Sequence, residues 1–302
     1  MTDHGPTGRT FDDFTRGLLD AGISRIPDES PPTRLAFRGT VEEHLALLSK
    51  AEAVLQALSR DPRIEDISSP LLHHPDLHKR NIVVDPEDPT KITAIIDWQS
   101  TCLDPALLYF SEVPDLCEHP RGIAHDAMDS YDCAPDQTPE EAEREDMLRK
   151  EVAILGAAWE LRLEASSPRL HAAQTLDHAL MRPFRYSSTT WQQGICGFRS
   201  DLISLYQEWT ALGLPGSCPY QPPEEELAKH TSQWEDFEME LELRKGMGMM
   251  NILSTDEEGF VHADNWDAIK EVSDALFEKW LADADADEMG REKAKQLWPF
   301  DY

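Results

Sequence analysis

Hydrophobic residues recur at helical spacing between Thr40 and Arg60. The leucines of this stripe share one face of a helix: Leu45, Leu48, Leu55 and Leu58. Thr40 and Glu43 have the spacing of a capping box at the start of the segment, and Asp61-Pro62 ends it. The pattern therefore predicts a helix whose apolar face is turned towards a core.

The spacing changes in the next part of the chain. The segments Ile82–Val84 and Ile92–Ile96 are rich in β-branched residues, which favour strands. Between them lies Asp85–Pro89, whose Asp and Pro residues are typical of a turn. The sequence therefore predicts a small antiparallel hairpin here.

Everything after the hairpin has a helical pattern. Thr138–Glu141 combines a capping Thr, a Pro suited to the first turn and a Glu three residues after the cap. A hydrophobic stripe follows it, formed by Leu148, Val152, Leu155, Trp159 and Leu163. Further helices are predicted at about 189–212, 223–245, 264–283 and 286–298. Residues 1–35 are rich in Gly, Pro, Asp and Thr, and they predict an irregular lead-in with one short helix near Phe11–Leu19.

Charge excludes several classes of partner. The 302 residues carry 28 Lys and Arg against 58 Asp and Glu, a formal net charge of −30. This field repels phosphate backbones, so nucleic acid is not an expected partner. The longest apolar run, Val152–Trp159, is far shorter than a membrane-spanning helix. No transmembrane segment is expected.

The five cysteines contain no C-x-x-C pair, which favours a reducing compartment over a disulfide framework. The first thirty residues contain neither the apolar stretch of a signal peptide nor the acid-poor, Arg-rich character of a transit peptide. No targeting segment is expected at this end, and a cytoplasmic location would follow in its absence.

The candidate chemistry lies in residues 71–82, LLHHPDLHKRNI, which contain H-x-D-L-x-x-x-N. The second strand of the predicted hairpin then ends at Asp97. Phosphoryl transfer needs a carboxylate at the acceptor hydroxyl and oxygen ligands that hold Mg²⁺ against the phosphates. Asp76, Asn81 and Asp97 fit these roles in that order. His74 would fix the loop by hydrogen bonding.

These motifs resemble the aminoglycoside phosphotransferase-like branch of the protein-kinase-like fold, whose catalytic loop reads H-x-D-x-x-x-x-N. H-P-D-L-H-x-x-N-I-x-V-D-P, I-I-D-W-Q and the later P-D-L are similar to the fungal family that includes altered inheritance of mitochondria protein 9. The resemblance is strongest over residues 71–116. It implies an α+β, mostly helical C-terminal lobe at residues 36–302, with the catalytic loop and metal hairpin in 36–118 and a helical subdomain in 119–302.

The same resemblance implies functional roles and partners. Asp76 would be the catalytic base, supported by His74, and Asn81 and Asp97 would bind Mg²⁺ and thereby ATP. The acceptor would be a hydroxyl of an unidentified small molecule. A mitochondrial location is implied by the named family alone.

A kinase-like N-terminal lobe is not visible in this sequence. Lys50 is the only lysine before Asp76, and it lies within the predicted helix Thr40–Arg60. No G-x-G-x-x-G motif precedes Asp76. We therefore expect a chain that lacks the nucleotide cover, that is weakly active or inactive by itself, and that a partner chain could complete.

Two other functions remain open. His125-Asp126, together with His73 or His74, would suit a metal-dependent phosphohydrolase, in which an H-D dipeptide bridges two metals. A kinase-like lobe without chemistry would instead be a binding or interaction protein. Stabilisation of the fold by Mg²⁺ and ATP would distinguish a catalytic phosphotransferase from such an interaction protein.

Overall fold

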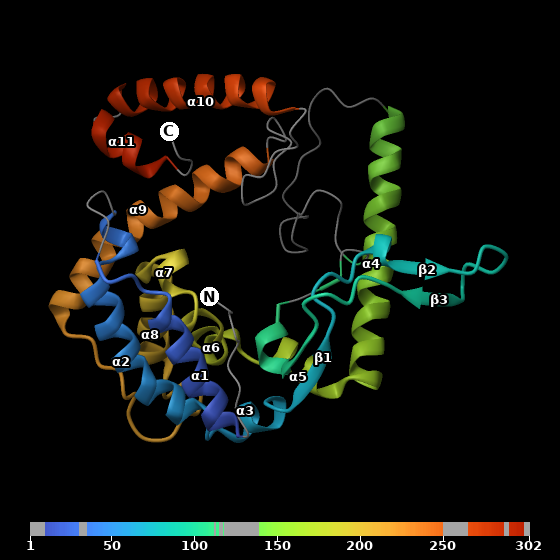
Figure 1. The fold of residues 1–302 in the computed structure, drawn as a ribbon, viewed down its shortest axis with the longest axis horizontal. Coiled ribbons are helices and arrows are strands. Elements are labelled where there is room, and N and C mark those ends of the chain that lie inside the picture. Colours follow the sequence, from blue (N-terminus) through green and yellow to red (C-terminus); the bar gives the residue numbers. More distant parts are fainter. Residues whose placement is uncertain are drawn as a thin grey trace. The chain divides into compact units, whose positions relative to one another are not determined.

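The computed structural model describes residues 10–29, 35–111, 113–114, 117, 139–249, 265–286 and 290–298. Helices dominate these residues, and their short strands form two separate antiparallel pairs. The mostly helical α+β class is thereby confirmed (Figure 1). His125 and Asp126, the phosphohydrolase candidates, lie outside the described residues. None of the described helices is long and apolar enough to cross a membrane.

The chain divides into two compact units. The first comprises Met1–Gly8, Asp13–Leu55 and Tyr186–Tyr302. The second comprises Arg9–Asp12 and Gln56–Arg185, and it contains every strand that the structure describes. All four candidate residues of the phosphotransferase motif therefore belong to the second unit.

Helix α2 (Val41–Leu58) starts with the predicted capping box. The backbone N–H of Thr40 donates to the Glu43 carboxylate at 2.9 Å, and the N–H of Glu43 donates to Thr40 Oγ1 at 3.3 Å. Leu45 was expected on the buried face, but it is exposed. The buried face of α2 lies to one side of Leu45. It is formed by Leu47, Leu48, Ala51, Val54, Leu55 and Leu58.

Helix α1 (Phe11–Ser24) corrects the expected irregular lead-in, since it runs beyond Leu19 to Ser24. Phe14, Leu18 and Leu19 are buried, so their burial rather than their local propensity stabilises the helix. Its last turn approaches another backbone closely. A Cβ atom at Gly22 would lie 2.2 Å from the carbonyl oxygen of Ser187, and only glycine fits there.

The remaining helices of the first unit confirm the helical pattern predicted for the second half of the chain. They are α7 (Thr190–Gln193), α8 (Ile195–Glu208), α9 (Glu224–Met249), α10 (Trp266–Ala286) and α11 (Arg291–Leu297). Helix α6 (Arg182–Ser187) includes the boundary between the units, which lies between Arg185 and Tyr186. The short helix η1 (Ala36–Arg38) contributes Phe37 to a cluster with Cys196 and Leu297. Trp234 and Phe237 of α9 cover this cluster, which ties α8, α9 and α11 together.

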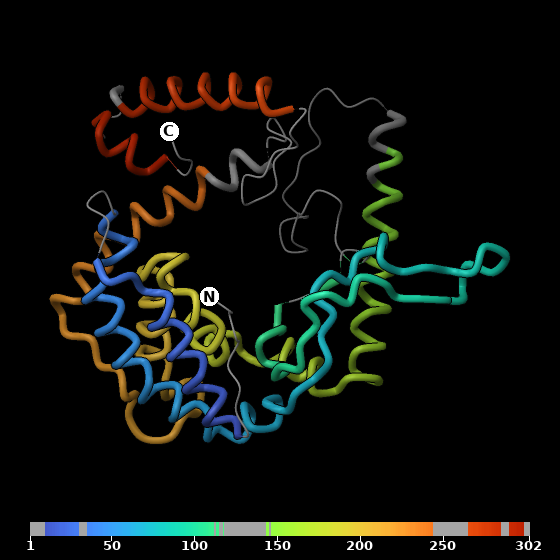
Figure 2. Tube along the Cα trace, viewed as in Figure 1, coloured from blue at the N-terminus to red at the C-terminus, as the bar shows by residue number. Residues whose placement is uncertain are grey.

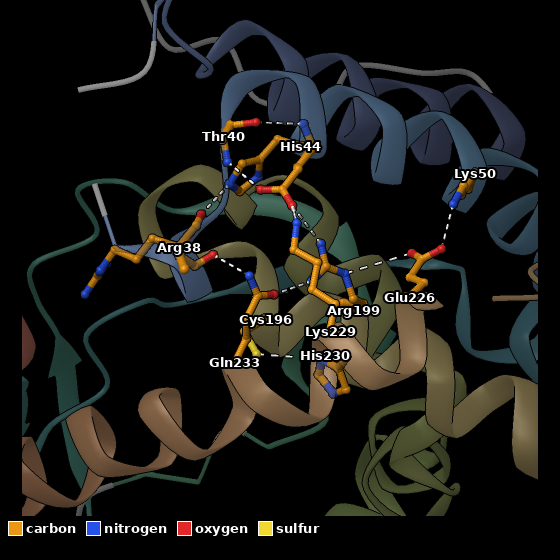
Figure 3. A network of polar contacts seen from close by, with 12 residues as sticks. Arg38, Thr40, His44, Lys50, Cys196, Arg199, Glu226, Lys229, His230 and Gln233 are labelled. Atoms are coloured by element: carbon orange, nitrogen blue, oxygen red, sulfur yellow. Dashed lines mark hydrogen bonds and ion pairs between the residues drawn. The ribbon is translucent and has the colours of Figure 1, made fainter. Parts of the chain in front are cut away.

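A buried network of charges joins α2, α8 and α9 within this unit (Figure 3). Arg199 is only 5% exposed, and its Nη1 donates to Gln233 Oε1 at 2.7 Å. Gln233 in turn donates to the carbonyl oxygen of Ala36 at 2.9 Å. The carboxylates of Glu43 and Glu226 lie 3.9 and 4.0 Å from the Arg199 guanidinium. The positive charge of Arg199 is therefore balanced inside the unit.

The second unit has its own core around α3 (Pro62–Ile67), α5 (Pro168–Thr175) and η3 (Ala106–Tyr109). The buried side chains there include Ile64, Ile67, Ala106, Leu107, Leu163, Ala173, Leu180, Met181 and Phe184. Helix α4 (Pro139–Ser166) places Leu163, the last residue of its predicted stripe, in the buried class and the other stripe residues in the half-buried class.

Two strand pairs complete this unit, and Figure 2 traces the chain that passes through them. Strands β2 (Ile82–Val84) and β3 (Ile92–Ile95) pair antiparallel at the two β-branched segments. Asp85 accepts backbone N–H groups of Glu87 and Asp88 at 2.8 and 3.2 Å, which closes the turn between them.

The other pair was not predicted. Strand β1 (Pro70–His73) pairs antiparallel with β4 (Cys102–Pro105), so His73 lies opposite Cys102. The expectation that only helices follow the hairpin is therefore wrong for residues 102–105. The two pairs frame the segments that contain the candidate site.

Candidate functional site

The loop that carries the motif lies between β1 and β2 and includes the short helix η2 (Lys79–Asn81). Asp97 lies two residues after the end of β3. Because Ile82 pairs with Ile95, the residues that flank these strands are neighbours: the N–H of Ile96 donates to the Asn81 carbonyl oxygen at 2.9 Å. The hairpin thus returns Asp97 to the edge at which the loop ends.

His74 joins the loop to the hairpin exit. The imidazole is buried; its Nε2 lies 2.9 Å from the carbonyl oxygen of Ile96, and its Nδ1 accepts the backbone N–H of Asp76 at 3.3 Å. This pattern corresponds to a ring that donates through Nε2 and accepts through Nδ1. The edge of the ring also packs against Trp98, with centroids 4.7 Å apart. His74 therefore positions both Asp76 and the residue before Asp97.

The carboxylate of Asp76 is held by three side chains of its own loop. Asn81 Nδ2 donates to Oδ2 at 2.8 Å, His78 Nε2 lies 2.7 Å from Oδ1, and Arg80 Nη2 lies 3.0 Å from each oxygen. Burial works against ionisation of this carboxyl. The hydrogen bonds from Asn81 and Arg80 and the charges of Arg80 and His78 outweigh it, so the pKa of Asp76 lies below its ordinary value.

Asn81 is buried at 5% exposure and presents its amide in a defined orientation. Its Nδ2 donates to the backbone oxygen of Asp76 at 2.7 Å as well as to the carboxylate. Both of these hydrogen bonds come from the amide nitrogen, so they leave the amide oxygen Oδ1 able to bind another group. An amide oxygen held in this way is a ligand type that Mg²⁺ accepts.

Asp97 lies at a special backbone position. Its φ of 65° is in the left-handed region, which Asp and Asn adopt more readily than most residues with a Cβ atom. Ser100, three residues later, has a φ of 60°. Trp98 Nε1 donates to the Ile95 carbonyl oxygen at 2.7 Å and closes the chain over this bend. Asp97 is exposed at this bend.

The donor set fits Mg²⁺ bound together with phosphates better than a metal bound by protein alone. Among the residues described, no group of three or more His, Cys, Asp and Glu side chains could hold a metal ion. Mg²⁺ commonly takes one or two carboxylates or amides and completes its shell with water and substrate phosphates. Asn81 Oδ1 and the Asp97 carboxylate are oxygen ligands of this type, and their role at a metal stays a prediction.

One group beside the loop was missed by sequence reasoning. The ring of Tyr109 stacks on His73 with centroids 3.6 Å apart, its hydroxyl donates to Asp104 at 2.8 Å, and Cys102 Sγ lies 3.0 Å from that hydroxyl. Burial and the acceptors around the hydroxyl raise the pKa of Tyr109. Little in the sequence signals this group, because Cys102–Pro105 shows no alternation of apolar and polar residues.

Lys50 is the one lysine that precedes Asp76 in the printed sequence. Residues 10–29 and 35–69 contain helices and connecting segments but no strand. Lys50 lies inside α2, as predicted, and its Nζ pairs with Glu226 at 2.8 Å. Its charge is thus used within the first unit.

The model of the phosphotransferase enzyme family matches residues 14–108. This range covers about a third of the chain, and it contains His74, Asp76, Asn81 and Asp97. It begins inside α1, in the part that was expected to be an irregular lead-in. No curated protein and no solved structure matches the chain. The match supports a phosphotransferase-like chain with a kinase-like fold.

Proposed function

We propose that this chain binds a nucleotide with Mg²⁺ and transfers a phosphoryl group from it to a hydroxyl of a small-molecule acceptor. One observation carries the proposal: His74 links the backbone N–H of Asp76 to the carbonyl oxygen of Ile96, the residue before Asp97. A single buried side chain thereby fixes the loop of the proposed base relative to that of the proposed metal ligand. The whole arrangement lies in the segment that matches the phosphotransferase enzyme family.

Each residue has a definite task in this proposal. Asp76 accepts the proton of the acceptor hydroxyl, and Asn81 orients Asp76 through Nδ2. Asn81 Oδ1 and the Asp97 carboxylate hold Mg²⁺. The bound ion supplies positive charge against the phosphates, which the acidic chain would otherwise repel. His74 acts through the backbone and touches neither substrate, so it is a positioning residue.

A second candidate is a kinase-like binding protein with little or no turnover. The pairing of Lys50 with Glu226 and the absence of strands in residues 10–29 and 35–69 favour it, because a phosphoryl donor without a lysine and a lid is poorly positioned. Another chain that supplies a nucleotide cover would restore turnover. The resemblance to the fungal family extends the proposal to a mitochondrial setting, which localisation of the tagged full-length protein tests.

Thermal unfolding with and without Mg²⁺ and ATP tests the binding half of the proposal. We expect the two ligands together to raise the melting temperature of the wild-type chain, and Asp97→Asn to lose this increase. Asp66→Asn, an equal charge change on the exposed side of α3, is the matched control and should keep it. No increase in the wild-type chain would refute nucleotide binding.

Turnover is tested separately with Asp76→Asn. We expect this variant to retain stabilisation by Mg²⁺ and ATP while ATP consumption falls to the background rate, because the base is lost and the metal ligands remain. Retained binding with no ATP consumption even in the wild-type chain would instead select the non-catalytic candidate.

A further inference from the structure

The acceptor positions of the Asp76 carboxylate are already filled. Oδ1 faces His78 Nε2 at 2.7 Å and Arg80 Nη2 at 3.0 Å. Oδ2 faces Asn81 Nδ2 at 2.8 Å and the same Arg80 nitrogen at 3.0 Å. An ionised carboxylate offers about four lone-pair positions, and this loop supplies a donor to each. A hydroxyl that approaches the partly exposed Asp76 carboxylate therefore competes with these donors.

The three donors differ in how easily they can leave. Asn81 is buried and is also anchored to the Asp76 backbone oxygen. The His78 ring is on a short side chain whose exposure is 39%. Arg80 is 69% exposed and reaches both oxygens through one terminal nitrogen of a long side chain. An exposed ion pair of this kind contributes little to stability, so Arg80 is the donor that can be displaced at the lowest free-energy cost.

The chemistry of Arg80 suits a phosphate partner. His78-Lys79-Arg80 is the only run of three consecutive basic residues in a chain with a net charge of −30. A guanidinium binds phosphate oxygens through two parallel N–H groups, and this geometry is better than the single-nitrogen contact that it makes with Asp76. Arg80 also directly precedes Asn81, which is a proposed ligand of the phosphate-bound Mg²⁺.

We propose that Arg80 is a displaceable arm: it occupies the Asp76 carboxylate while the site is empty, and it moves to the phosphate groups when a Mg²⁺-bound polyphosphate enters. The movement frees Asp76 for the acceptor hydroxyl and supplies a phosphate-binding cation from the catalytic loop itself. This inference rests on the proposed function of the site. It adds that Arg80, a residue of the same loop, controls the access of the acceptor hydroxyl to the proposed base Asp76.

Calorimetric titration of the full chain tests the arm with three probes: Mg²⁺-ATP, Mg²⁺-tripolyphosphate and adenosine. We expect Arg80→Gln to weaken binding of both polyphosphates by about tenfold or more and to leave adenosine binding unchanged. The polyphosphate affinity of Arg80→Lys should be intermediate, because lysine keeps the positive charge but lacks the two parallel N–H groups of the guanidinium. Lys91→Gln removes an equally exposed cation that pairs with Asp88 in the hairpin turn, and it should leave all three affinities unchanged.

A double-mutant cycle isolates the link between Arg80 and Asp76. If Asp76 holds Arg80 in the empty site, Asp76→Asn should tighten Mg²⁺-tripolyphosphate binding in the wild-type background. The gain should be clearly smaller in the Arg80→Gln background. Equal gains in the two backgrounds would show that only the local charge matters, and they would overturn the proposed arm.

Other outcomes also decide the question. Equal polyphosphate affinities of wild type and Arg80→Gln overturn the arm while leaving the proposed function intact. A wild-type chain that binds neither polyphosphate refutes the proposed function first, and the arm with it. If Arg80→Gln does not fold, the ¹⁵N resonance of Arg80 Nε in the wild-type chain replaces it. The arm requires that resonance to shift with Mg²⁺-tripolyphosphate and not with adenosine.

Discussion

The ring of His74 and the carbonyl oxygen of Ile96 lie 2.9 Å apart, although 22 positions separate the two residues in the chain. This contact spans the base of the β2–β3 hairpin and brings the loop of Asp76 beside the exit to Asp97. It joins the segment of His74 and Asp76 to the residue that precedes Asp97.

His74→Phe should break this link while filling a similar volume. We expect the free energy of unfolding to fall by about 1–3 kcal/mol, because the Ile96 carbonyl and the Asp76 N–H lose their buried partner. Stabilisation by Mg²⁺ and ATP should also disappear. Urea unfolding with and without the ligands measures both effects. Unchanged ligand stabilisation in a folded His74→Phe variant would contradict the positioning role.

Arg199→Met should be more damaging than any exposed charge change in the same network. Loss of the guanidinium leaves Gln233 Oε1 without its donor and the nearby Glu43 and Glu226 carboxylates less balanced. We expect the free energy of unfolding to fall by about 2 kcal/mol or more.

Lys50→Met is the matched comparison, since Lys50 pairs with Glu226 from a half-exposed position. Its loss should cost less than about 1 kcal/mol. Chemical denaturation of both variants gives the difference. Equal effects would mean that the burial of Arg199 has no energetic weight.

A pair of glycine substitutions tests the close approach of α1. In Gly22→Ala the new Cβ would meet the Ser187 carbonyl oxygen, so the variant should lose about 1–3 kcal/mol. In Gly156→Ala the new Cβ meets nothing within 4 Å on α4, and the variant should gain up to about 1 kcal/mol from helix propensity. Thermal unfolding compares the two. A neutral Gly22→Ala would show that α1 can move away from Ser187.

Asp61 gives a test of pH dependence. Its carboxylate caps α3 by accepting the N–H of Arg63 at 2.9 Å. The side-chain hydrogen bond from Arg63 lowers the pKa of Asp61 despite partial burial. A lowered pKa stabilises the fold above the ordinary Asp value of about 3.9, and this contribution is lost as the pH falls through the folded-state pKa.

Asp61→Asn keeps a capping side chain but cannot titrate. The variant should therefore be less stable than wild type at neutral pH, and the difference should shrink as the pH falls below about 4. Melting temperatures of both proteins between pH 7 and pH 2.5 measure it. A difference that grows towards acid would reverse the sign of the argument.

Much of the local structure followed from the sequence. The capping box at Thr40 and Glu43, the turn after Asp85 and the later helices each depend on contacts within a few residues, so neighbouring letters contain the information. The candidate residues of the site also came from short motifs, since His74, Asp76 and Asn81 share one loop and Asp97 follows the hairpin; their roles stay a prediction. Leu48, Leu55 and Leu58 are buried as expected, whereas Leu45 lies beyond the edge of that face, and only packing decides where the buried face ends.

The sequence by itself determined which residues could carry the chemistry and which segments form helices, because both are local properties. Only the tertiary structure decided that β1 pairs with β4, that Arg199 is buried, and that Arg80 occupies Asp76. The first two depend on contacts between segments far apart in the chain, whose pairing no short pattern specifies. The third depends on side-chain rotamers in a loop, where several donors compete for one carboxylate and the fold selects among them.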